Sequence, residues 1–125
     1  MPRLVSTFKI LVWLIAAATG VVIASLANAA PGGSPLSLTL TLKDHRFTPA
    51  TLTVPAGARV KITLINRDAA TEEFDSHDLR IEQLVTPMAK ISFNVGPLAP
   101  GQYSFIGEFH ASTAQGKIIV VPAGR

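Results

Sequence analysis

At 125 residues the chain has room for one domain with a compact core. Its formal charge is +3, but Arg3 and Lys9 in the opening segment supply two of the positive charges, so the remainder is nearly neutral. The other Lys and Arg residues are scattered singly, and we expect no nucleic-acid partner. The sequence has no cysteine, which excludes disulfides, thiolate metal sites and thiol catalysis.

Residues 1–29 have the organisation of a signal peptide. Arg3 and Lys9 form a basic start, an uncharged run follows over residues 10–26, and Ala27-Asn28-Ala29 supplies small residues for cleavage. We therefore expect export and a periplasmic location. The alternative is an uncleaved membrane anchor, because the apolar run is only slightly short for a spanning helix. Membrane contact is then expected only through this leader.

Residues 30–35 (APGGSP) read as a flexible leader, and residues 36–122 as one all-β domain. Leucines alternate with Ser and Thr over residues 36–42, which predicts a strand with one buried face. Several further segments carry strand signals and end at turn residues. These predicted strands are residues 51–54, 59–66, 79–85, 90–95, 103–109 and 117–121.

The turn signals predict how the strands are arranged. Pro55-Ala56-Gly57 predicts a hairpin joining residues 51–54 to residues 59–66. The polar stretch at residues 66–78 (NRDAATEEFDSHD) is predicted to be a long functional loop. If the hairpin forms, His45 lies at the same end of the domain as that loop. Short strands without helical periodicity predict a Greek-key β-sandwich.

Several motifs in order resemble those of the cupredoxins. They are F-x-P, V-P-A-G before a long strand ending in Asn, a polar loop with His-Asp, and P-G-x-Y-x-F before a His-bearing loop. The resemblance covers residues 36–121 and implies a cupredoxin-like fold. In that family the last loop carries Cys, His and Met. Here Gly107 occupies the cysteine position, and the methionine position falls near Ala114.

The strings TEEFDSHDL and GEFHASTAQG are similar to a cysteine-free branch of periplasmic iron- and copper-handling proteins, related to the cupredoxin domain of iron-transport proteins. The resemblance implies a metal-ligand role for the four residues that match the motifs of that branch, which are Glu73, His77, Glu108 and His110. His45 joins them because of its predicted place at the same end. If the strand over residues 103–109 continues, Glu108 and His110 share a face.

Each candidate ligand also has a structural explanation. His77 is also explained as a solvated surface histidine, and His110 as a loop residue bonded to the backbone. Glu73 is equally well explained as a hydrogen-bond acceptor for a ligating imidazole or as a solvated charge. Glu72 is expected to face solvent, and Met88 to fill a gap rather than to bind Cu(I).

The donor types decide which chemistry is expected. Without a thiolate, a blue copper electron-transfer centre is not expected. Imidazole and carboxylate donors suit a type-2-like copper ion or an iron ion. We expect a periplasmic metal-binding protein that captures the ion or delivers it, with a membrane iron or copper transporter as a partner. The alternatives are a thiolate-free copper oxidoreductase that oxidises ferrous iron, and a metal-free docking module. The protein is expected not to be an enzyme.

Overall fold

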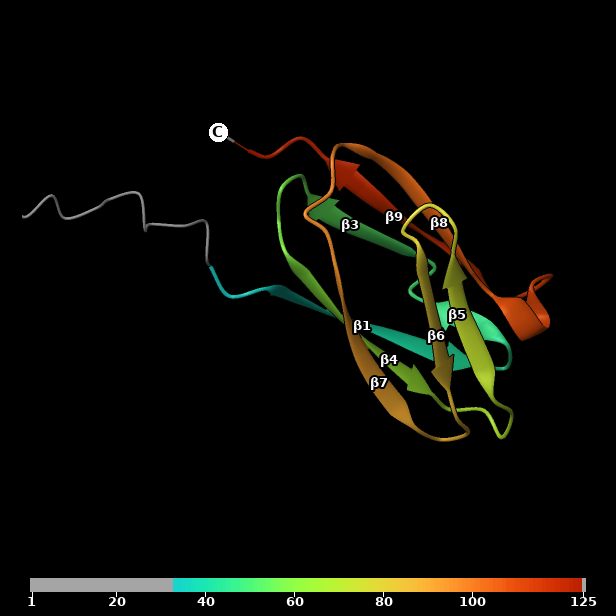
Figure 1. Cartoon of the computed structure of the whole chain (residues 1–125). Coiled ribbons are helices and arrows are strands. Elements are labelled where there is room, and N and C mark those ends of the chain that lie inside the picture. Colours follow the sequence, from blue (N-terminus) through green and yellow to red (C-terminus); the bar gives the residue numbers. More distant parts are fainter. Residues whose placement is uncertain (1–32, 125) are drawn as a thin grey trace, which may run out of the picture. The chain divides into compact units, whose positions relative to one another are not determined.

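The computed structural model describes residues 33–124, and the predicted signal peptide at residues 1–29 lies outside them. These residues form an all-β sandwich of two sheets (Figure 1). No helix in this part of the chain has the length and apolar character to cross a membrane. In chain order the elements are β1 (Leu36–Lys43), β2 (Arg46–Thr48), β3 (Thr51–Pro55), β4 (Val60–Asn66), β5 (Glu72–Ser76), β6 (Ile81–Val85), β7 (Lys90–Val95), β8 (Gly101–Gly107), the short 3₁₀ helix η2 (Glu108–His110) and β9 (Gln115–Val121).

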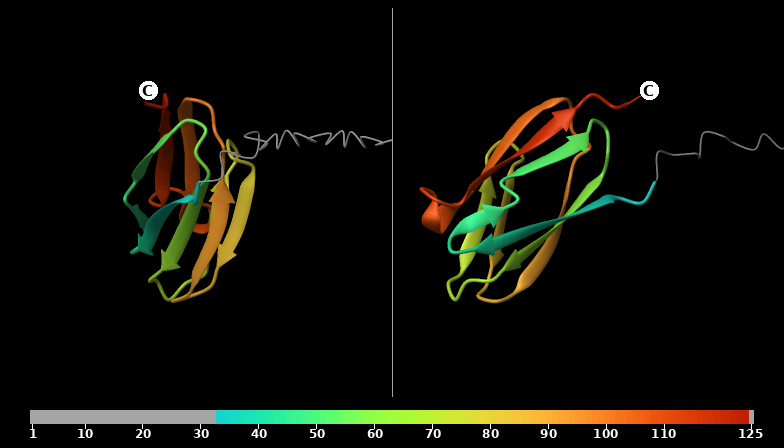
Figure 2. Two further views of the ribbon diagram at one scale, coloured as in Figure 1. Left: turned by 90° about the vertical axis from the view of Figure 1, so that its left-hand side faces the viewer. Right: turned by 180° about the vertical axis from the view of Figure 1, so that it is seen from behind.

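The strand order confirms the predicted cupredoxin-like Greek-key sandwich. One sheet has the order β2-β1-β4-β7 and the other the order β3-β9-β8-β5-β6. Two pairs are parallel, β1 with β4 and β3 with β9, and the other pairs are antiparallel. Figure 2 shows the two layers from the side and from behind. Strands that are neighbours in sequence therefore often lie in opposite sheets.

The alternation along β4 shows how the core is built. Val60, Ile62 and Leu64 are almost completely buried, whereas Lys61 between them is exposed. The same period of two buries Leu52 and Val54 of β3 and Ile118 and Val120 of β9. Side chains on successive strand residues point to opposite faces, so each sheet turns one apolar face toward the other.

An aromatic cluster fills the centre of the sandwich. The rings of Phe74 and Phe105 stack at 4.9 Å between centroids, and Phe47 contacts Phe105 edge-on at 5.2 Å. Phe93 lies 4.8 Å from Phe74. Offset and edge-on pairs of this kind add to the stabilisation from burial. Phe47 lies just after the β1–β2 turn, and Phe74 lies just after the connection from β4 to β5. The packing of their rings therefore helps to hold these two connections in place.

The predicted hairpin between residues 51–54 and 59–66 is wrong. β3 pairs in parallel with β9, whereas β4 lies in the other sheet between β1 and β7. The turn at Gly57, which has a φ of 78°, carries the chain across the sandwich. The sequence signal for a turn was correct, but turn residues do not determine whether the next strand returns to the same sheet.

The predicted loop over residues 66–78 is also wrong in part, since β5 lies within it. Glu72, Phe74 and Ser76 face inward and are buried, while Glu73 and Asp75 face outward. β5 pairs with both β6 and β8. Inward and outward residues alternate along β5, but two of the three inward residues are polar. A search for alternating hydrophobic residues therefore does not detect this strand.

The strand predicted over residues 103–109 ends earlier, at Gly107. Glu108–His110 instead form a 3₁₀ turn, η2. The carbonyl of His110 accepts hydrogen bonds from the N–H groups of Thr113 and Ala114, which reverse the chain into β9. The expectation that Glu108 and His110 share a strand face is therefore wrong, because the alternation of strand side chains does not extend into a 3₁₀ turn.

Candidate metal centre

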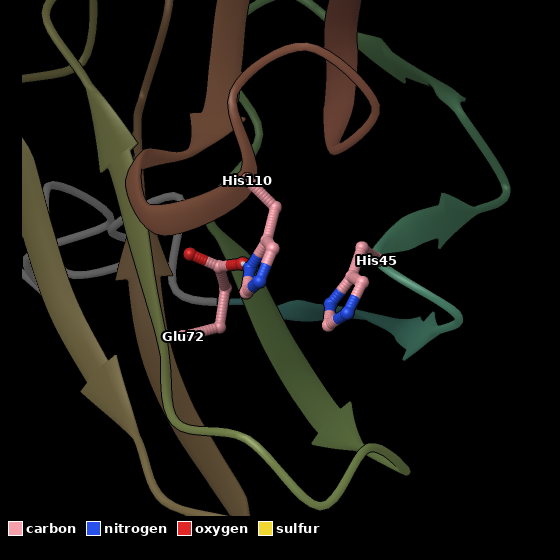
Figure 3. A group of neighbouring side chains, drawn as sticks. All are labelled: His45, Glu72 and His110. Carbon is pink, nitrogen blue, oxygen red and sulfur yellow. Dashed lines mark hydrogen bonds and ion pairs between the residues drawn. The ribbon is translucent and has the colours of Figure 1, made fainter.

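Among the residues that the structure describes, one group of three side chains has the composition of a metal site. His45, Glu72 and His110 each offer one ligand atom, and these atoms all lie within 4.8 Å of one another. Figure 3 shows the ring of His110 between the Glu72 carboxylate and the ring of His45. The three come from the β1–β2 turn, the start of β5 and the end of η2, so three separate segments meet here.

His45 is presented by a tight turn in an uncommon backbone conformation. Asp44 and His45 both have positive φ, 50° and 55°, as in a two-residue type I′ hairpin turn between β1 and β2. Their backbone N–H groups donate to the two carboxylate oxygens of Asp68, at 2.7 and 2.9 Å. A residue more than twenty positions away therefore holds the turn that carries His45.

Asp68 is itself buried and fixed. Its backbone N–H donates to the side-chain oxygen of Asn66, whose amide group donates to carbonyls of Ala70, Val85 and Thr86. Asn66 is 1% exposed and Asp68 is 7% exposed. A satisfied polar network of this kind rigidifies the end of a sandwich.

The ionised form of Asp68 is favoured by its surroundings. Burial by itself would raise the pKa of Asp68, but the hydrogen bonds from the N–H groups of His45 and Asp44 lower it, with help from the positive charges of His45 and Lys43. The net result is a lowered pKa. Asp68 thus remains a charged acceptor for the turn at neutral pH.

Glu72 is the most deeply buried member of the group, with 1% of its surface exposed. Its Oε1 accepts hydrogen bonds from the backbone N–H groups of Phe109, at 2.8 Å, and Glu73, at 3.0 Å. Its Oε2 lies 2.7 Å from Nδ1 of His110. The backbone contacts fix the carboxylate, so that one oxygen is held toward the imidazole.

The rings of His45 and His110 are stacked, with centroids 3.5 Å apart and an interplanar angle of 9°. The His110 side chain is 30% exposed and that of His45 is 41% exposed. A hollow of about 510 Å³ lies against His45, lined also by Lys43, Asp68 and Ala69 among others. The two imidazoles therefore stand between a buried carboxylate and solvent.

The structure brings together two of the five residues predicted as ligands, His45 and His110. His77 is not in this group. It follows Ser76 at the far end of β5 from Glu72, about 17 Å away along the chain at the usual rise per strand residue. There it lines a different hollow, of about 440 Å³, with Asp75 and Arg80 among others. A ligand role for His77 stays a prediction.

Glu73 and Glu108 are also outside the group. Glu73 points to the outer face of β5, opposite to Glu72, and Glu108 is exposed on η2. Partial burial raises the pKa of Glu73, and the negative charges of Glu82, Asp75, Glu108 and Glu72 raise it further. Glu73, Asp75, Glu82 and Glu108 thus form an acidic outer surface, and a ligand role for Glu73 and Glu108 stays a prediction.

Sequence reasoning missed the contribution of two carboxylates. Glu72 was expected to face solvent, which is wrong, since it is buried and contacts His110. The spacing Glu72-Phe74-Ser76 was the available signal, because Phe74 marks the inward face of β5. Asp68 gave no such signal, since its role depends on a turn that is distant in sequence.

Comparison with known proteins gives a family match over most of the chain. The model of the cupredoxin-like domain family matches residues 11–120. An uncharacterized protein of Rickettsia prowazekii (strain Madrid E) is 44% identical over 85 residues, which are 68% of each chain.

Solved structures with the same fold include copper proteins. Auracyanin A, a blue copper protein of Chloroflexus aurantiacus, has a TM-score of 0.60 at 18% identity and covers 70% of this chain and all of its own. The metal-binding domain of a Cu(I)-exporting P-type ATPase of Streptococcus pneumoniae, solved with Cu(I), has a TM-score of 0.61 at 15% identity over 68% of this chain and 84% of its own. Auracyanin B has a TM-score of 0.63 at 14% identity, and the match covers 72% of this chain and 92% of auracyanin B.

The donor set of this chain does not fit a blue copper centre. Such a centre needs a cysteine thiolate, and the sequence has none. Two imidazoles and one carboxylate do fit a nitrogen- and oxygen-ligated ion, either tetragonal Cu(II) or iron in a two-histidine, one-carboxylate set. The same fold thus carries a different kind of candidate site.

Proposed function

Because the chain belongs to the cupredoxin-like domain family, we propose that it is an exported metal-binding protein that holds copper or iron through His45, His110 and Glu72. The observation that carries the proposal is the convergence of these three side chains from three segments, with ligand atoms within 4.8 Å of one another. A buried carboxylate needs a partner that balances its charge, and a cation bound between it and the two imidazoles is such a partner.

The surroundings of the three residues support this function. The carboxylate is held by two backbone N–H groups, and the turn under His45 is held by Asp68. Metal sites depend on such outer partners to orient their ligands. The imidazoles are partly exposed, which gives an ion a route in and out. Exchangeable binding, as in capture and delivery, suits this arrangement.

Export to the periplasm and delivery to a membrane transporter complete the proposal. The basic start, apolar run and small-residue cleavage signal of residues 1–29 support export. The fold is shared with the metal-binding domain of a copper-exporting ATPase, which supports a partner of the transporter class. Expression of the full chain with a periplasmic extraction would test the location, and recovery of the protein only in the cytoplasm would contradict it.

The decisive experiment is a Cu(II) titration of the domain followed by electron paramagnetic resonance, with an iron titration alongside. We expect stoichiometric binding and a non-blue, nitrogen-ligated Cu(II) signal that a His45→Ala, His110→Ala double variant loses. Affinity should fall in acid, because an imidazole must lose a proton to bind a metal ion. Absence of stoichiometric copper or iron binding would contradict the proposal and favour a metal-free docking module.

Turnover separates binding and delivery from oxidation. If the copper-loaded protein oxidises ferrous iron faster than the same concentration of free copper does, the result supports the oxidoreductase alternative. We expect no such acceleration, because capture and release require only the binding site described. Oxygen uptake with ferrous iron as the electron donor gives the readout.

A further inference from the structure

The centre contains a close contact that explains why a glycine stands at position 107. A Cβ atom built on Gly107 would lie 2.7 Å from Cδ of Glu72, 2.9 Å from its Oε2, and 2.7 Å from Cβ of Ala114. The backbone does not demand glycine here, since the φ of −88° and ψ of 108° suit any residue. Space alone requires it, because the Glu72 carboxylate and the Ala114 side chain fill the position that a Cβ would take.

The buried position of the Glu72 carboxylate is energetically costly unless its charge is balanced. Glu72 is 1% exposed, and its Oε2 lies 2.7 Å from Nδ1 of His110, its ion-pair partner within residues 33–124. A buried carboxylate is stable only when hydrogen bonds and a positive charge balance it. Two backbone N–H groups supply the hydrogen bonds. A bound cation beside Glu72 and His110 would supply the positive charge.

The identity of the donor that fills this space has a chemical consequence. Soft sulfur donors favour Cu(I), whereas carboxylate oxygen favours harder ions, and imidazole serves both. We infer that Glu72, seated in the space that Gly107 leaves, makes the centre selective for Cu(II) and iron ions over Cu(I). This inference rests on the proposed function and names the class of ion that the same site takes.

The test compares Cu(II) and Cu(I) affinities of the wild-type domain and a Glu72→Gln variant, each measured by competition with a chelator for that oxidation state. Glutamine keeps the shape and one acceptor oxygen but removes the charge. We expect Cu(II) affinity to fall about tenfold or more, with Cu(I) affinity nearly unchanged. Glu82→Gln is the control, since it removes an exposed charge from the neighbouring strand β6 and should change neither affinity.

A measurement on the wild-type protein supports the test if the variant fails to fold. Tighter binding of Cu(II) than of Cu(I) lowers the reduction potential of bound copper below that of the aqueous couple. A potential above the aqueous couple, or equal losses of both affinities in Glu72→Gln, would overturn the inference while leaving metal binding intact. Failure of the wild-type domain to bind copper or iron at all would instead overturn the proposed function.

Discussion

His45 and His110 lie face to face, with their ring centroids 3.5 Å apart and their planes 9° from parallel. A nitrogen lone pair lies in the plane of its ring, so two parallel rings direct their lone pairs along separate planes. One imidazole must turn before both bind the same ion. His45 is the more exposed of the two side chains, so it is the ring with room to turn.

The stack allows the ligand role of His45 to be separated from its packing role. A His45→Phe variant keeps an aromatic ring against His110 but has no nitrogen. We expect the free energy of unfolding to fall by no more than about 1–2 kcal/mol, because Phe keeps the stack but fits the positive φ at this position less well than His, while Cu(II) affinity falls by more than about 100-fold. Thermal unfolding and a Cu(II) titration provide the two measurements.

The same titration tests the prediction that His77 is a ligand. Since His77 lies at the opposite end of β5 from Glu72, a His77→Ala variant should bind Cu(II) as the wild type does. A loss of affinity comparable to that of His45→Phe would place the site elsewhere and contradict the three-residue centre.

Asp68 is expected to control both stability and metal affinity through the turn. In Asp68→Asn, one oxygen that accepts a backbone N–H is replaced by an NH₂ group, which sets donor against donor. We expect the variant to lose about 1–3 kcal/mol of stability and about tenfold in Cu(II) affinity. Asp44→Asn is the matched control, because the Asp44 side chain is 82% exposed. Equal effects of the two substitutions would refute the anchoring role.

The lowered pKa of Asp68 predicts how the stability of the metal-free domain varies with pH. A carboxyl whose pKa is lower in the folded than in the unfolded state stabilises the fold above the unfolded value, about 3.8. That contribution is lost as the pH falls below this value and through the folded pKa. The stability advantage of the wild type over Asp68→Asn should therefore shrink as the pH falls below about 4, where Asp68 becomes protonated. Urea unfolding across a pH series measures it, and a difference that grows in acid would have the wrong sign.

The contact at Gly107 predicts a stability cost for the smallest possible side chain. In Gly107→Ala the new Cβ must displace the Glu72 carboxylate or Ala114. Overpacking of this kind costs about 1–3 kcal/mol, and displacing the carboxylate should also weaken Cu(II) binding. Gly33→Ala serves as a control, since a Cβ there meets nothing within 4 Å. Unchanged melting and binding in Gly107→Ala would show that the carboxylate has room elsewhere.

Much of the fold followed from local patterns. The alternation in residues 36–42 and 59–66, and the strands at residues 90–95 and 117–121, were predictable because a period of two with apolar inward positions is a local property of the chain. The partners of these strands were not. β3 was expected to pair with β4 and pairs with β9 instead, because pairing depends on how two sheets close around one core.

The sequence by itself determined the chemistry available to this protein: an all-β domain without cysteine, and three histidines and several carboxylates as donors. It also placed His45 and His110 among the candidates. Only the tertiary structure decided which donors meet. Glu72 and Glu73 are neighbours of the same type, yet one faces inward beside His110 and the other faces outward among other carboxylates. The reason is that adjacent residues of a strand point to opposite faces, and that the space beside Gly107 exists only once β5, β8 and η2 have packed together.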